Sequence, residues 1–104
     1  MPAPDNPRRL LVFAPAGDAS VIRQRESLSG REAGLRERDL RVEYRTGEAE
    51  EFAAVLIGRD GGEKLRSRSP ISAEELFGKI DEMPMRRREM REREEREHEE
   101  RERE

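Results

Sequence analysis

Two short stretches without a single polar residue constrain the fold of this chain more than any other feature. They are residues 10–14 (LLVFA) and residues 52–57 (FAAVLI). A strand that is apolar at consecutive positions shows apolar side chains to both faces of a sheet, so it fits best in the middle of that sheet. The rest of the chain is highly polar, since 45% of its residues are charged. We therefore expect these two stretches to be the central strands of one small sheet.

Two further stretches have the pattern of edge strands. Residues 40–45 alternate between apolar and charged side chains, so the apolar side chains face a core and the charged side chains face water. Residues 63–67 contain one large apolar residue and also have the pattern of an edge. Asp60 and Gly61 stand between the last two strands, where they predict a tight hairpin turn with two residues at positive φ.

The first predicted helix follows the first strand. Asp18 or Ser20 caps it, and it runs to about Arg36. Gly30 and Gly34 weaken it. Three apolar residues spaced by seven share its buried face: Val21, Leu28 and Leu35.

The second predicted helix begins at Ser72. Ser72 and Glu75 form a capping box, in which the Ser72 hydroxyl accepts from the Glu75 amide and the Glu75 carboxylate accepts from the Ser72 amide. Pro84 ends or kinks this helix. Residues 46–51 are polar and too few for a stable helix.

These elements predict an α/β fold with the order strand, helix, strand, strand, strand, helix. A right-handed crossover makes strands one and two parallel, and the hairpin makes strands three and four antiparallel. The predicted sheet order is 2-1-3-4, which is the order of a minimal thioredoxin-like fold. We divide the chain into a flexible lead-in (1–8), this domain (9–82) and an Arg/Glu-rich tail (83–104) that is helical or disordered.

Four stretches also resemble one known family. Residues 11–15, 36–40, 55–66 and 83–86 are similar, in the same order, to the thioredoxin-like domain of unknown function called DUDES. That domain occurs in bacterial proteins and in vertebrate matrix proteins such as equarin and the sushi-repeat proteins. The family has no established catalytic residues, so the resemblance implies the fold and a non-redox role in binding or matrix organisation.

No residue pattern predicts catalysis, a cofactor or a metal site. The chain has no cysteine, which excludes thiol–disulfide exchange, and Ala53 and Ala54 stand where such enzymes place a clamp proline. Ser20 has no base beside it, because the one histidine is His98 in the tail. The alternative function is an enzyme or a small-anion-binding protein whose pocket, at the end of the first strand, contains Asp18 and Ser20.

Charge and hydropathy limit the partners. The net charge of −3 is shared between the domain and the tail, which argues against nucleic acid as a partner. No apolar run approaches the length that crosses a bilayer, so no membrane segment is expected. The N-terminus as written has no signal peptide, which leaves a secreted or periplasmic protein, if a precursor signal was removed, or otherwise a cytoplasmic one.

One face of the predicted sheet lacks a cover. Both predicted helices pack on the same face, and residues 46–51 are too short to cover the other one. Exposed apolar patches of several hundred Å² usually mark interfaces. We therefore expect a protein partner or self-association through this face, or its coverage by Met83, Met85 and Met90.

Overall fold

Four strands form one mixed sheet in the computed structural model, which describes residues 6–103. The strands are β1 (Arg8–Ala14), β2 (Leu40–Thr46), β3 (Ala53–Ile57) and β4 (Glu63–Ser67). Their order is β2-β1-β3-β4, with β1 parallel to β2 and β3 antiparallel to both β1 and β4. The predicted order and strand directions are confirmed, and they are consistent with a thioredoxin-like arrangement.

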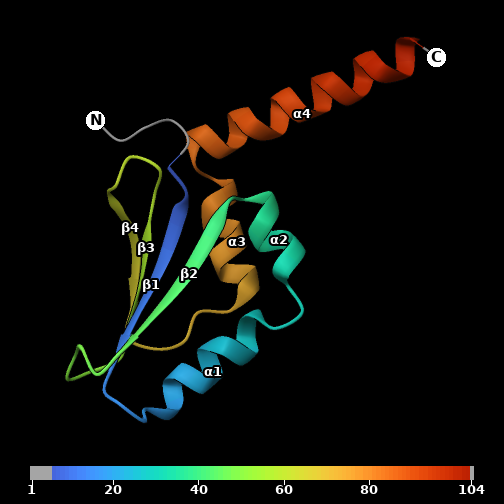
Figure 1. The fold of residues 1–104 in the computed structure, drawn as a ribbon. Coiled ribbons are helices and arrows are strands. Elements are labelled where there is room, and N and C mark those ends of the chain that lie inside the picture. The colour runs from blue at the N-terminus through green and yellow to red at the C-terminus, as the bar shows by residue number, and fades with distance from the viewer. Residues whose placement is uncertain (1–5, 104) are drawn as a thin grey trace.

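Helices cover one face of this sheet (Figure 1). They are α1 (Ala19–Leu28), α2 (Glu32–Glu37) and α3 (Ala73–Asp81). Alternate residues of the strands, such as Leu10, Val12 and Leu56, are fully buried beneath them. From the helices, Leu76 and Ile80 pack into the same core. The core therefore lies between the sheet and these helices.

The single helix predicted from residue 18 to 36 is wrong, because the chain breaks it into α1 and α2. Gly30 has a φ of +77°, a left-handed conformation that glycine adopts without steric cost, and it ends the first helical segment. Leu35 of α2 still packs against the core. Ile22 of α1, although apolar, is 60% exposed.

The hairpin between β3 and β4 is confirmed, but its predicted turn type is wrong. Gly61 has a φ of +82°, whereas Asp60 is not in the left-handed region. Residues 58–62 form a five-residue loop, in which the Gly61 N–H donates to the Gly58 carbonyl at 3.0 Å. Asp60 accepts a hydrogen bond from the Gly62 N–H at 2.9 Å instead. A loop of this length needs a left-handed residue at one position only.

The chain ends in a long helix, α4 (Pro84–Arg103), that projects from the body (Figure 1). Ser72 caps α3 as predicted by accepting from the Glu75 N–H at 3.1 Å, although the reciprocal bond is not formed among the described residues. Pro84 separates α3 from α4, as its fixed φ predicts. None of the helices within residues 6–103 has the length and apolarity to cross a membrane.

The predicted lead-in overlaps the sheet. Its residues 1–5 lie outside the described part of the chain. Arg8, its last residue, is the first residue of β1 and is only 1% exposed. It lies on the same face as Leu10 and Val12, so an arginine occupies one end of an otherwise apolar row.

Candidate functional site

Asp18 and Ser20, the predicted ligand pocket, lie where β1 leads into α1. The structure brings them together, because an Asp18 carboxylate oxygen accepts a hydrogen bond from the Ser20 N–H at 2.8 Å. This is the contact of a helix N-cap, and it identifies Asp18 as the capping residue in place of Ser20. Ligand binding by these two residues stays a prediction.

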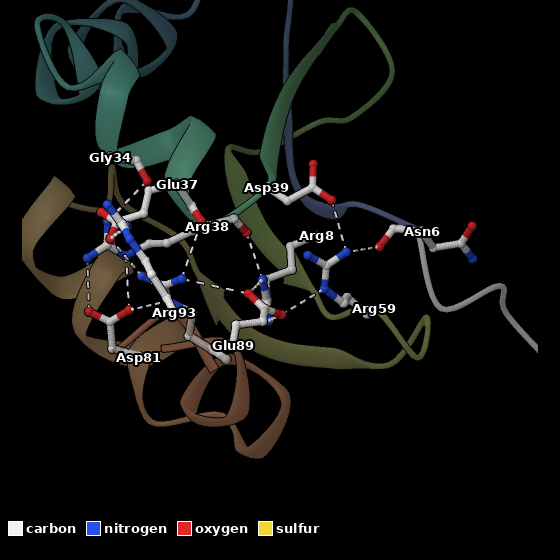
Figure 2. Close-up of polar contacts among 11 residues, drawn as sticks. Asn6, Arg8, Gly34, Glu37, Arg38, Asp39, Arg59, Asp81, Glu89 and Arg93 are labelled. Atoms are coloured by element: carbon white, nitrogen blue, oxygen red, sulfur yellow. Dashed lines mark hydrogen bonds and ion pairs between the residues drawn. The ribbon is translucent and has the colours of Figure 1, made fainter. Parts of the chain in front are cut away.

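The densest cluster of polar side chains lies at the opposite end of β1 (Figure 2). We call it the ionic cluster. Its members come from β1, the end of α2, the β3–β4 loop, the end of α3 and the start of α4. They are Arg8, Glu37, Arg38, Asp39, Arg59, Asp81, Arg86, Glu89 and Arg93.

Arg8 is the most deeply buried charge of the ionic cluster. One of its terminal nitrogens donates to the Arg38 carbonyl at 2.7 Å, and the other donates to a Glu89 carboxylate oxygen at 2.9 Å. A buried guanidinium is tolerated only when it is paired and hydrogen-bonded. Glu89 therefore supplies the charge that allows Arg8 to stay inside the fold.

Glu89 joins three arginines. Besides Arg8, it accepts from Arg59 Nε at 3.2 Å and lies 3.7 Å from Arg86. Burial by itself raises the pKa of the Glu89 carboxyl, but the hydrogen bond and charge of Arg8, assisted by Arg59, outweigh burial and hold that pKa below its ordinary value. Glu89 thus fastens the first turns of α4 to β1 and to the β3–β4 loop.

Asp81 makes the matching junction at the end of α3. It accepts from Arg38 at 2.9 Å and from Arg86 Nε at 3.1 Å. Burial raises the pKa of the Asp81 carboxyl, yet these two hydrogen bonds outweigh it and lower the pKa overall. Glu37, at the end of α2, also contacts α4, since it lies 3.2 Å from Arg86 and 2.8 Å from Arg93.

The chemistry of the ionic cluster is structural. A general acid or base works best with a pKa near the operating pH, whereas the pKa values of Asp81 and Glu89 are lowered. Each of its carboxylates faces at least one arginine. No group of three potential metal ligands occurs within residues 6–103. The cluster therefore holds elements of the fold together.

A cavity of about 550 Å³ lies beside the ionic cluster, between the β3–β4 loop and the α3–α4 junction. Its walls mix both signs of charge with apolar groups, among them Arg59, Lys64, Glu82, Met83 and Met85. The Lys64 ammonium is already paired with Asp60 at 2.8 Å. Neither sign of charge dominates these walls, so the cavity does not select a ligand by charge.

The second face of the sheet carries no helix (Figure 1). We call it the open face. Its apolar centre comes from β1 and β3 and consists of Leu11, Phe13, Ala53, Val55 and Ile57. These residues alternate with the core residues along each strand, so they point away from the helices. The apolar runs of both central strands therefore place side chains on both faces of the sheet, and helices cover only one of these faces.

Charged side chains of β1 and β2 lie beside this apolar centre. Arg9 donates to both carboxylate oxygens of Glu43 at 2.9 Å, and Arg45 joins the same carboxylate at 3.3 Å. Hydrogen bonding from Arg9 lowers the pKa of Glu43. The Arg45 guanidinium also stands 5.8 Å from the Phe13 ring centre.

The open face is less exposed than the sequence predicted. Leu11 and Phe13 are half-buried and Val55 is 3% exposed. Met83 and Met85 do not supply the cover, and Met90 lies half-buried in α4. Met83 packs against the core beneath the helices, and Met85 is 46% exposed.

Comparison with known proteins gives one match. A family model described as "Domain of unknown function (DUF4174)" matches residues 39–89, which is 51 of the 104 residues. The matched segment runs from Asp39, the residue before β2, to Glu89 in α4. No curated protein and no solved structure matches the chain. The match supports a domain of unknown function, and the resemblance to DUDES domains remains a prediction.

Sequence reasoning missed the ionic cluster. It placed Arg8 in the lead-in and Glu89 in a solvated tail, so neither was considered as part of a site. One signal was available, because Arg8 continues the even-numbered row of Leu10, Val12 and Ala14 and therefore had to face the core once the strand began two residues earlier.

Proposed function

We propose that this chain is a non-catalytic protein-interaction domain of the DUDES type, with a thioredoxin-like fold, and that it binds through the open face. The observation that carries the proposal is the row of apolar residues on β1 and β3 that no helix covers. Leu11, Phe13 and Ile57 stay partly exposed on this face, and apolar side chains gathered on one uncovered face often mark a binding site.

The chemistry of the chain supports a binding role. Without cysteine it cannot carry out thiol–disulfide exchange. The carboxylates of the ionic cluster are held by arginines and have lowered pKa values at Asp81 and Glu89. The alternative of an enzyme or anion-binding pocket rests on Asp18 and Ser20, whose mutual contact is that of a helix cap.

Photo-crosslinking tests the proposal because it captures a partner whose identity is not specified in advance. A photoreactive phenylalanine analogue replaces Phe13 on the open face, and in a control chain it replaces Arg23, an exposed residue of α1. Both chains are irradiated in cells that express the protein natively, and adducts are identified by mass spectrometry. We expect defined adducts from position 13 and not from position 23. Equal labelling at both positions, or none at position 13, would overturn the proposal.

A further inference from the structure

We infer that the partner of the open face is a second copy of this chain, packed face to face about a two-fold axis that runs along the strands. This inference rests on the proposed function and names its partner. It follows from the way the register of the sheet distributes charge over the two edges of the open face.

The register sets out the open face as rows that cross the four strands from β2 to β4. The first row contains Arg41, Arg9, Ile57 and Glu63. The second row contains Glu43, Leu11, Val55 and Arg66. In both rows the residue on β2 and the residue on β4 carry opposite charges. The sign also reverses from the first row to the second.

A two-fold axis along the strands superimposes the β2 edge of one copy on the β4 edge of the other, row by row. Arg41 then faces Glu63 of the second copy, and Glu43 faces Arg66 of the second copy. Each contact occurs twice, because a two-fold interface is self-complementary. All four edge contacts in these rows therefore join opposite charges.

The apolar centre fits the same arrangement. The axis places β1 of one copy over β3 of the other, so Leu11 meets Val55 and the Phe13 ring meets the small Ala53. Large residues over small ones allow two sheets to interdigitate at the usual spacing of about 10 Å.

A face-to-face two-fold axis perpendicular to the strands pairs different residues. It places β2 over β2, so that an axis through Glu43 brings Glu43 onto Glu43 of the second copy, which disfavours association, whereas an axis between the two rows brings Arg41 onto Glu43 of the second copy. Only the axis along the strands brings Arg41 opposite Glu63 of the second copy. This contact therefore distinguishes the proposed arrangement from the others.

Arg41 is the residue best placed to respond to a second copy. It is exposed, and it forms no ion pair with the described part of its own chain. By contrast Glu63, its expected counterpart, has an exposed pair with Arg66 at 2.8 Å. A second copy would supply Arg41 with a carboxylate partner.

The size of the open face limits how stable the proposed dimer can be. Four strands about 4.8 Å apart and about six residues long, at about 3.4 Å per residue, cover about 400 Å². Stable complexes bury about 800 Å² per partner. We therefore expect a weak dimer that forms only at high protein concentration.

Charge reversal tests this geometry. Sedimentation velocity from about 1 μM to about 1 mM, a range in which weak dimers form, follows the wild type, Arg41→Glu, Glu63→Arg and the control Arg23→Glu. Each of the first two variants should raise the dissociation constant about tenfold or more, since it turns two attractive contacts into repulsive ones. Arg23→Glu should leave it unchanged.

Mixing the two variants gives the decisive measurement. In the mixed dimer Glu at position 41 faces Arg at position 63, and the other contact keeps its native pair. An equimolar mixture of Arg41→Glu and Glu63→Arg should therefore recover the wild-type affinity, although each variant alone does not. A merely structural effect of either substitution cannot produce this rescue.

Crosslinking gives a second readout that does not depend on charge. Because the chain has no cysteine, Arg41→Cys and Glu63→Cys each introduce a unique thiol. A bismaleimide with a spacer of about 10 Å, the distance between packed sheets, should join the two variants when they are mixed. Arg41→Cys mixed with Arg23→Cys should give no such product.

A monomer throughout the concentration range would overturn the inference, as would a dimer that neither charge reversal weakens or that the mixture does not restore. If the photoreactive residue at position 13 nevertheless labels a different protein, the proposed interaction function stands and only the second copy is wrong. If it labels nothing, both fail.

Discussion

Removal of the Glu89 carboxylate should destabilise the whole fold, although Glu89 lies in a helix that projects from the body. In Glu89→Ala, Arg8 loses its hydrogen bonds to both carboxylate oxygens, at 2.9 and 3.4 Å, and keeps the one to the Arg38 carbonyl. Its guanidinium cannot move into water without displacing the start of β1, because Arg8 is 1% exposed.

The magnitude follows from the burial of the two partners. Breaking a fully buried ion pair by removing one partner costs about 3 to 5 kcal/mol. Glu89 is 31% exposed, so water compensates for part of the loss, and we expect a decrease of about 2 to 3 kcal/mol in the free energy of unfolding. For a domain of this size this lowers the melting temperature by about 10 to 20 °C.

Urea unfolding followed by circular dichroism measures the effect. Glu95→Ala is the matched control, because it makes the same substitution at an exposed position of the same helix. The control should change the unfolding free energy by less than about 0.5 kcal/mol. Equal effects of the two substitutions would refute the view that Glu89 stabilises a buried arginine, and would leave only a local effect on the helix.

The same carboxylate makes stability depend on pH. The pKa of Glu89 is lower in the folded chain, so the unfolded chain binds its proton more readily. Its contribution is therefore complete above the unfolded pKa of about 4.3 and disappears as the pH falls through the folded value. The difference in stability between the wild type and Glu89→Gln should shrink from pH 7 to pH 3. A difference that stays constant over this range would contradict the assigned ion pair.

Three further substitutions test the packing of the helices. Gly34→Ala places a Cβ 2.6 Å from the Phe77 ring and should cost about 1 to 3 kcal/mol in urea unfolding. Gly78→Ala meets no atom within 4 Å and should stabilise α3 by up to about 1 kcal/mol in the same assay. Gln24→Leu removes the buried hydrogen bonds that join α1 to both the N–H and the carbonyl of Ile71, at 2.8 and 2.9 Å, and should cost about 2 kcal/mol in urea unfolding. Equal effects of the two alanines, or a neutral Gln24→Leu, would show that these contacts are not formed in solution.

Much of the sheet could be predicted because its signals are local. Continuous apolar runs and strict alternation are properties of five or six neighbouring residues, and burial of both faces or of one face is enough to rank strands as central or edge. The helix break near Gly30 was harder, since glycine is also tolerated inside a helix at a modest cost. Its left-handed conformation became visible only in the folded chain.

The sequence by itself determined the α/β class, the order β2-β1-β3-β4 and the lack of thiol chemistry, because these depend on composition and on short-range periodicity. Only the tertiary structure decided that α4 is fastened to the body. Arg8 and Glu89 are separated by 81 residues, and no spacing rule links an arginine at the start of the first strand to one glutamate among nine in the tail. Ion pairs depend on distances of a few ångströms, and those distances exist only after β1, α2 and α3 have packed together.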